Sequence, residues 1–154
     1  MNAPVTEMTD QTTLMLRRVY DTDIDTLFRA LTDPEAIRQW FGPGTAKVHH
    51  AEGEIRVGGR WAIEMVGDNC EEHNVSGEYT QVDPPNRVSF TWAWASTPEN
   101  VSEVTYALSP APEGGTTLTL THARLANADA RDRHAFGWNG SLDKLGPWLD
   151  GGAG

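Results

Sequence analysis

The strongest constraint on the fold of this chain is an alternating pattern between residues 77 and 94. Two short extended runs flank a turn at 83–86, and the second run places a large apolar residue at every second position. These residues are Val88, Phe90, Trp92 and Trp94. Because successive side chains of a strand point to opposite faces, all four share one face of a β-sheet. So much aromatic bulk must pack on a core or line a cavity that holds a small apolar molecule.

The composition indicates one domain and argues against polyanionic partners. A chain of 154 residues with 38% hydrophobic content has enough apolar material for a single core. Its 22 acidic and 12 basic residues give a net charge of -10, which repels nucleic acids and anionic membranes. We therefore expect neither as a partner. The single cysteine, Cys70, excludes an internal disulfide and fits a reducing compartment, so the cytoplasm is the expected location.

Both ends of the chain are expected to be flexible tails around one domain at 13–150. Residues 1–12 are small and polar, and they contain no apolar run that could form a signal peptide or a membrane span. Residues 151–154 are glycine and alanine and have little to bury. No internal repeat or low-complexity stretch divides the sequence between them, so a single domain is predicted.

The first part of this domain is predicted to be a strand followed by two helices. Residues 13–20 form the strand, and apolar residues at helical spacing follow in 24–31. Asp33 and Pro34 are suited to cap and open a second, short helix that ends near Trp40. From residue 46 the period becomes two, which predicts six further strands in an antiparallel meander. Their ranges are 46–52, 59–66, 74–82, 87–95, 101–109 and 116–122.

A long helix is predicted beyond Asn127, because apolar residues recur there at spacings of four, three and four. These residues are Trp138, Leu142, Leu145 and Leu149. The helix must cover the sheet, and Gly137 permits a close approach to whatever it packs on. The Gly-Pro pair at 146–147 is expected to kink or end the regular helix near Leu145.

A series of short motifs runs along nearly the whole chain. They are Leu31-Thr32-Asp33-Pro34-Glu35 leading to Trp40, Gly58-Gly59-Arg60-Trp61, Gly77-Glu78-Tyr79 running to Asp83-Pro84-Pro85, Phe90-Thr91-Trp92, the run 115–122, and Gly137-Trp138 before Leu142 and Leu145. With its motifs in this order, the sequence resembles the heat-shock ATPase activator homologue-like family of the START and birch-pollen-allergen helix-grip superfamily.

The resemblance implies an α+β helix-grip fold. In it, a curved antiparallel sheet of seven strands wraps around a long C-terminal helix, two short helices follow the first strand, and a cavity lies between helix and sheet. It does not specify a chemistry, because such relatives range from lipid carriers and hormone receptors to cyclases, drug-sequestering resistance proteins and co-chaperones.

The candidate ligand-binding residues are the aromatic and titratable side chains expected around that cavity. Most of them would equally serve as ordinary core. His122 continues the inward face of Leu118 and Leu120, and His134 lies one helical turn before Trp138. The full set is Trp40, Phe41, Trp61, Met65, Phe90, Trp92, Trp94, Tyr106, His122, His134, Phe136 and Trp138.

No metal, cofactor or nucleophile is predicted. Residues 70–73, Cys-Glu-Glu-His, contain three ligand types, but no second cysteine or paired histidine motif completes a zinc site. Acidic neighbours raise the pKa of a thiol, which disfavours Cys70 as a nucleophile. Gly58 and Gly59 precede a strand rather than a helix, so they indicate a turn or bulge with positive φ instead of a phosphate site.

Three functions remain open at this point. The leading hypothesis is a non-enzymatic protein that binds a small hydrophobic, aromatic or lipid-like molecule between the sheet and the last helix. The second is a cyclase or hydrolase in which His122 acts with Glu64, Tyr79 or Tyr106. The third is a co-chaperone-like interaction module. Self-association into a homodimer is also left open.

Overall fold

The computed structural model describes residues 5–42, 44–67 and 70–151. Eight strands form one antiparallel sheet in the order β1-β2-β8-β7-β6-β5-β4-β3. The strands are β1 (Val5–Asp10), β2 (Thr13–Tyr20), β3 (Lys47–Gly53), β4 (Arg60–Val66), β5 (Glu72–Asp83), β6 (Arg87–Trp94), β7 (Ser102–Pro110) and β8 (Thr116–Ala123). The helices are α1 (Ile24–Thr32), α2 (Pro34–Trp40) and α3 (Ala128–Asp150).

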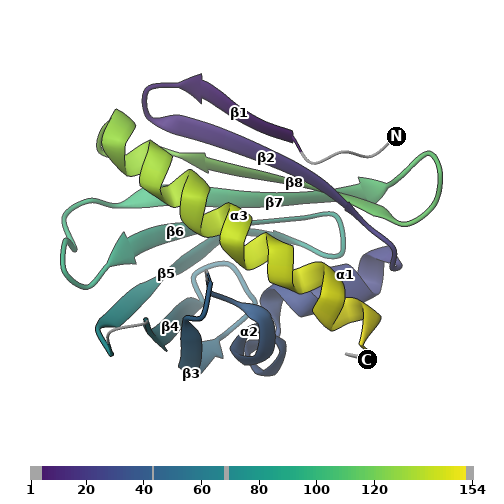
Figure 1. Cartoon of the computed structure of the whole chain (residues 1–154), viewed down its shortest axis with the longest axis horizontal. Helices are drawn as coiled ribbons and strands as arrows, with labels where there is room; N and C mark the ends of the chain where they lie inside the picture. The colour runs from purple at the N-terminus through teal and green to yellow at the C-terminus, as the bar shows by residue number, and fades with distance from the viewer. Residues whose placement is uncertain (1–4, 43, 68–69, 152–154) are drawn as a thin grey trace.

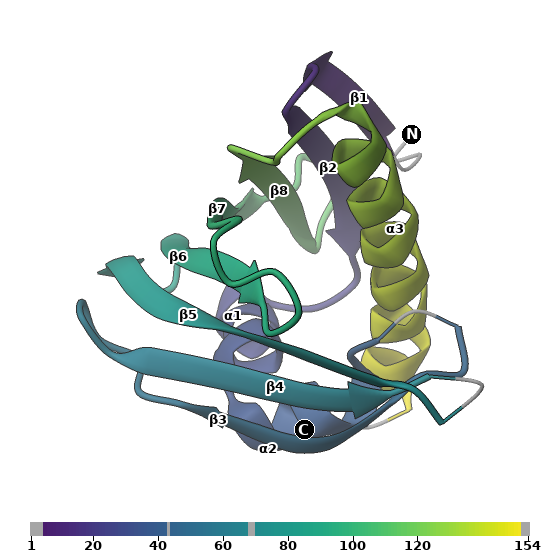
Figure 2. The same ribbon diagram turned by 90° about the vertical axis from the view of Figure 1, so that its left-hand side faces the viewer.

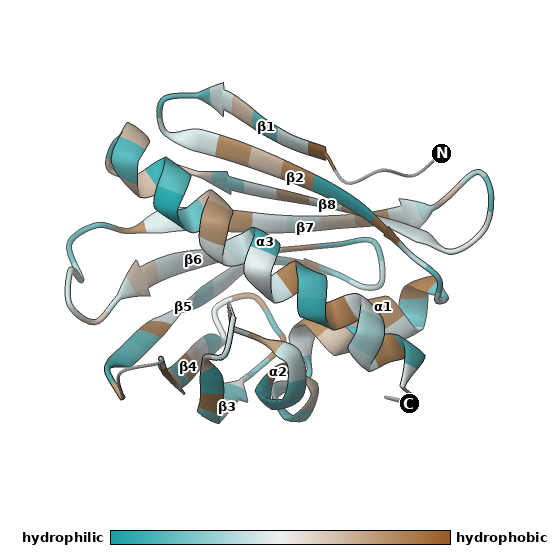
Figure 3. Ribbon diagram, viewed as in Figure 1, coloured by the Kyte–Doolittle hydropathy of each residue, from teal (hydrophilic) through white to brown (hydrophobic). Residues whose placement is uncertain are grey.

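The sheet curves around the C-terminal helix, as the family resemblance implies. Figure 1 shows α3 running diagonally across the sheet, from the side of β1 and β2 toward α1 and α2. In the view turned by 90°, the strands follow an arc from β1 to β3, with α3 on the concave side (Figure 2). Hydrophilic bands alternate with hydrophobic ones along the visible side of α3 (Figure 3). This is the pattern of a helix with one face on a sheet and the other in solvent.

The strand count corrects the prediction of seven. The additional strand, β1, pairs with β2 and lies within 1–12, which the sequence had assigned to a flexible tail. Its side chains are mostly exposed, so it carries no alternating apolar pattern and is held by main-chain hydrogen bonds to the edge of β2. Residues 1–4 and 152–154 of the predicted tails lie outside the described residues. Gly151 follows α3 directly and donates its N–H to the carbonyl of Pro147 at 2.9 Å.

The prediction that the last helix falters near Leu145 is wrong. α3 continues to Asp150 with Pro147 inside it. Proline removes one helical N–H donor, and here this loss falls in the last turn, where few hydrogen bonds depend on it. The helix begins as its N-cap requires, because the Asn127 side chain accepts a hydrogen bond from the Ala130 N–H at 2.8 Å.

Other local predictions are confirmed. Asp33 accepts from the Glu35 N–H at 3.0 Å, and Pro34 occupies the first helical turn of α2. Gly58 has a φ of +84° in the turn before β4. A Cβ on the adjacent Gly59 would lie 2.1 Å from the carbonyl oxygen of Glu54, so the backbone approaches too closely there for any side chain.

Polar contacts fix α3 against β2. Arg18 is buried and holds Asp143 and Asn139 through its two terminal nitrogens, at 2.8 and 2.7 Å. Two residues along, the Tyr20 hydroxyl donates to the Leu142 carbonyl at 3.0 Å. These bonds set the position of the helix over the edge of the sheet that lies away from the candidate site.

We expect the Tyr20→Phe substitution to lower the free energy of unfolding by about 1 kcal/mol, the usual net contribution of one buried hydrogen bond. Tyr79→Phe is the matched control. Tyr79 is equally buried, but no hydrogen bond of its hydroxyl is found within the described part of the chain. Urea unfolding of both variants measures the difference. Equal losses of unfolding free energy in the two variants would show that the Tyr20 hydroxyl does not anchor α3.

Candidate functional site

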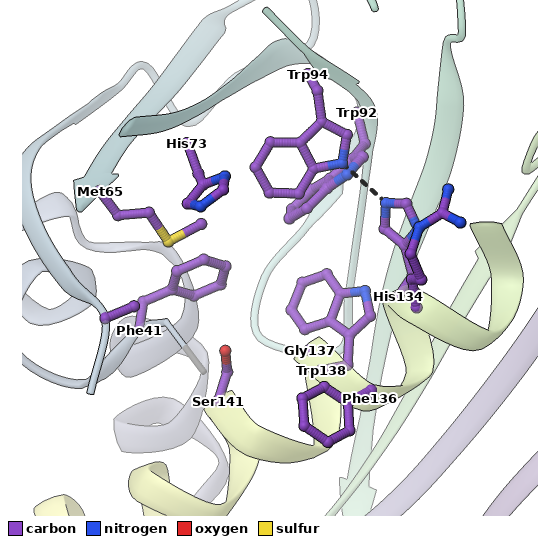
Figure 4. A pocket seen from close by; sticks show the side chains of 12 residues that line it. Phe41, Met65, His73, Trp92, Trp94, His134, Phe136, Gly137, Trp138 and Ser141 are labelled. Carbon is purple, nitrogen blue, oxygen red and sulfur yellow. Dashed lines mark hydrogen bonds between the residues drawn. The ribbon is translucent and has the colours of Figure 1, made fainter. Parts of the chain in front are cut away.

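A pocket of about 300 Å³ opens between the middle of α3 and the ends of β4, β5 and β6. Figure 4 shows aromatic side chains from these elements facing one another across it. The corner that follows α2 closes one side with Phe41. The twelve lining residues are Phe41, Ala46, Met65, His73, Trp92, Trp94, Arg133, His134, Phe136, Gly137, Trp138 and Ser141.

Trp92 is the centre of the aromatic wall. Its ring centroid lies 5.1 Å from that of Trp138, 5.5 Å from that of Trp94 and 5.6 Å from that of Trp61. Phe41 packs edge-on against Trp138 at 5.7 Å. Offset and edge-to-face contacts of this kind stabilise aromatic clusters beyond their buried area. The wall is therefore built jointly by the sheet, the final helix and the helical corner.

His134 accepts the indole N–H of Trp94. The donor nitrogen lies 2.9 Å from Nε2 of His134, and Nδ1 of the same ring lies 2.7 Å from the Ala130 carbonyl. The ring must therefore be neutral, with its proton on Nδ1, because a protonated Nε2 would face another donor. Burial lowers the pKa of His134, the hydrogen bond to Ala130 opposes this shift, and the charge of Arg133 adds to it.

His122 is fully buried and has both ring nitrogens bonded. Nδ1 accepts the Trp138 indole N–H at 3.0 Å, so Nε2 carries the proton and donates to Ser102 Oγ at 2.7 Å. Ser102 in turn donates to the Trp92 carbonyl at 3.1 Å. Burial, followed by the influence of nearby His134, holds the pKa of His122 well below its usual value. The neutral ring links α3 to β6, β7 and β8.

Seven of the twelve predicted site residues line the pocket, and five do not. The seven that line it are Phe41, Met65, Trp92, Trp94, His134, Phe136 and Trp138. Trp61, Phe90 and Tyr106 lie behind them around a space of only about 20 Å³. Trp40 is core, with its indole N–H donated to the Ala30 carbonyl at 2.8 Å, and His122 belongs to the buried network just described.

Phe136 differs from the enclosed side chain that the sequence predicted. It is 79% exposed and contributes to the pocket only at its edge. The spacing explains this position. Trp138 points to the sheet, and a residue two positions earlier on a helix lies about 200° around the axis.

Five lining residues were not predicted: Ala46, His73, Arg133, Gly137 and Ser141. Ser141 lies three residues after Trp138 on the same helical face, a spacing that could have identified it. It is 2% exposed, accepts the Gly42 N–H at 3.2 Å, and directs its hydroxyl toward the space between Phe41 and Trp138 (Figure 4). Gly137 does not serve close packing, because a Cβ there would meet no heavy atom within 4 Å.

The groups proposed for catalysis do not converge. Glu64 alternates with the buried Trp61, Ile63 and Met65 along β4, so it lies on the opposite face of the sheet. Burial raises the pKa of Tyr79 to about 12 and that of Tyr106 further. Within the described residues, no three His, Cys, Asp or Glu side chains are grouped so that they could hold a metal ion.

A curved antiparallel sheet that grips a long helix beside an aromatic pocket defines a helix-grip protein. The family model described as "Activator of Hsp90 ATPase homolog 1-like protein" matches residues 21–150. This chain belongs to that family. No helix in the described part of the chain has the length and apolar character needed to cross a membrane.

Solved structures agree with this assignment. The AHSA1 protein from Silicibacter pomeroyi is 31% identical, with a TM-score of 0.80 over 90% of this chain and 97% of its own. A protein from Rhodobacter sphaeroides is 23% identical and shares the fold, with a TM-score of 0.84 over 97% and 99% of the two chains. CalU16 from Micromonospora echinospora is 27% identical, with a TM-score of 0.68 over 97% and 85%. No curated protein matches the sequence.

Proposed function

We propose that this protein binds a small, flat, apolar molecule in the pocket between α3 and the ends of β4, β5 and β6. The observation that carries the proposal is the space of about 300 Å³ beside an otherwise packed aromatic cluster. Sites for small ligands are concave and mostly apolar, and this space has both properties. The family fold commonly binds hydrophobic ligands, which supports the same conclusion.

The size of the pocket limits the ligand. A volume of about 300 Å³ equals roughly ten water molecules and lies at the lower end of the range for ligand pockets. It suits a molecule of two or three fused rings, or a short aliphatic chain. A long lipid would have to extend through the open side into solvent.

Two of the three indole N–H groups at the pocket are not available to a ligand. Trp94 and Trp138 give their N–H groups to His134 and His122, so these donors are already bonded within the protein. The ring faces remain as the ligand-contacting surface. Planar molecules gain most from such faces, because offset stacking adds to the area they bury.

A hydrolase or cyclase is less well supported. His122, the residue proposed as acid or base, does not line the pocket, and both of its ring nitrogens are already bonded. Its proposed partner Glu64 lies on the other face of the sheet. A general base must come within hydrogen-bond distance of a proton on the substrate. Neither His122 nor Glu64 is placed to do so for a molecule in this pocket.

A size series at Gly137 tests the proposal. Since a side chain there has open space and the residue lines the pocket, Gly137→Leu should fill part of it. We expect binding of a flat probe such as 2-naphthamide to weaken at least tenfold in Gly137→Leu and less in Gly137→Ala. The free energy of unfolding should not fall, because replacing a glycine inside a helix by alanine raises it by about 0.8–1 kcal/mol. Calorimetric titration and thermal unfolding measure the two quantities.

Gly146→Ala is the matched control. Gly146 belongs to the same helix but lies against Tyr20, away from the pocket. The Gly146→Ala variant should therefore bind the probe as the wild type does. If Gly137→Leu binds as tightly as the wild type, the probe occupies another site and the proposal fails.

A further inference from the structure

The polar side chains of the pocket indicate the charge of its ligand. Among the twelve described lining residues there is no carboxylate, and Arg133 carries the one permanent charge. His134 is held neutral because its Nε2 accepts the indole N–H of Trp94. His73 lies 3.5 Å from the carboxylate of Glu71, which offsets any charge it gains. Arg133 therefore brings the one fixed charge of the described lining, a positive charge, to the mouth of the pocket.

Arg133 lies where it can reach a bound molecule from the solvent side. It is exposed, directly precedes His134 on α3, and lines both the apolar pocket and a second, more polar space of about 310 Å³. The two spaces also share Trp92, Trp94 and His134. The guanidinium thus stands at the boundary between an apolar compartment and water, where the charged end of an amphipathic ligand would lie.

The guanidinium has no ion-pair partner within the described residues, although acidic side chains are abundant. Among the described residues, five other arginines lie within 4.0 Å of a carboxylate: Arg18, Arg38, Arg56, Arg124 and Arg131. Asp132, the residue before Arg133, pairs with Arg131 at 3.0 Å and not with Arg133. The charge of Arg133 is therefore free to bind a carboxylate from a ligand, in the forked geometry that guanidinium groups favour.

A second polar group of the pocket, an indole N–H, lacks a hydrogen-bond acceptor. The indole N–H of Trp92, which lines both spaces, is buried and has no hydrogen-bond partner among the described residues. An unpaired buried donor costs about 1–3 kcal/mol. This nitrogen has almost no surface open to solvent, so a ligand oxygen reaches it only if the indole ring or its neighbours shift. Aromatic walls also bind organic cations, but the charge of Arg133 opposes a cation at this mouth.

We propose that the ligand is an apolar anion: a flat ring system in the pocket with one carboxylate at the mouth, bound by Arg133. This inference rests on the proposed function, since it specifies the chemistry of the molecule held in the same pocket. The aromatic wall supplies most of the affinity, and Arg133 discriminates acid from neutral analogue.

The test compares three probes of one shape. They are 2-naphthoate, the uncharged 2-naphthamide and the cationic 2-naphthyltrimethylammonium, titrated calorimetrically at pH 7.5, where a carboxyl with a pKa of about 4 is ionised. The proteins are the wild type, Arg133→Met, Arg133→Glu and the control Arg29→Met. Arg29 is an exposed helical arginine on α1 that lines none of the described pockets, so its substitution makes the same change in net charge.

We expect the wild type and Arg29→Met to bind 2-naphthoate about fivefold more tightly than 2-naphthamide, which corresponds to about 1 kcal/mol for a partly solvated ion pair. Arg133→Met should abolish this preference, and Arg133→Glu should reverse it. Two outcomes overturn the inference but leave the pocket proposal standing. They are equal binding of acid and amide by the wild type, or tighter binding of the cation. Absence of binding by all three probes would overturn both proposals.

Discussion

Replacing Trp138 with alanine should lower the free energy of unfolding by about 4 kcal/mol, the largest effect that we expect from a single substitution. Trp138 is 3% exposed and lies against Phe41, Trp92 and Tyr106, so its removal opens a large cavity in the aromatic cluster. It also leaves Nδ1 of His122 without its donor. Urea unfolding followed by circular dichroism measures the loss.

Two further variants separate the contributions to this loss. Trp138→Phe keeps an aromatic ring but removes the indole N–H, and should cost about 2 kcal/mol through the smaller ring and the unpaired His122 nitrogen. Phe136→Ala, two residues away on the same helix, removes a side chain that is 79% exposed and should change stability by less than about 0.5 kcal/mol. If Trp138→Ala resembled Phe136→Ala, the packing of α3 on the sheet described here would be wrong.

The buried His122 and the half-buried His134 should make the protein less stable as the pH falls below neutrality. Their folded-state pKa values lie below 6.5, the value of an unperturbed histidine, so the unfolded state takes up protons first. Their contribution to stability is complete above pH 6.5 and is lost as the pH falls from there toward the folded pKa values. His122, the more deeply buried ring, should account for most of the loss, and the contribution of His134 has the same sign.

Urea unfolding at pH 8, 7, 6 and 5 measures this loss. His134→Gln retains an acceptor for the Trp94 N–H but does not titrate, so its stability should fall less steeply than that of the wild type. Nitrogen-15 NMR of the wild type should also show the proton on Nε2 of His122 and on Nδ1 of His134 at pH 6. A free energy of unfolding that stays constant from pH 8 to pH 5 would contradict the buried network.

The sequence identified most of the fold because burial on one face of an element leaves a period in the chain. The alternation at 88–94 became β6, with Val88, Phe90 and Trp92 buried as expected. The apolar spacing beyond residue 127 became α3. The order of short motifs led to the correct family, which the match over 21–150 shows. Seven of the twelve predicted site residues line one pocket, because the inward face of a strand or helix is also the face that lines an enclosed space.

What the sequence could not give depends on the space between elements. β1 is held by backbone hydrogen bonds, which involve no particular side chain and leave no pattern in the residues of Val5–Asp10. The proton positions on His122 and His134 follow from indole groups 16 and 40 residues away in the chain. The opening at Gly137 and the position of Arg133 beside it depend on how far α3 stands from β6. Periodicity determines which face of an element is buried, whereas the distance between two buried faces, and hence a pocket, is decided only when the elements pack.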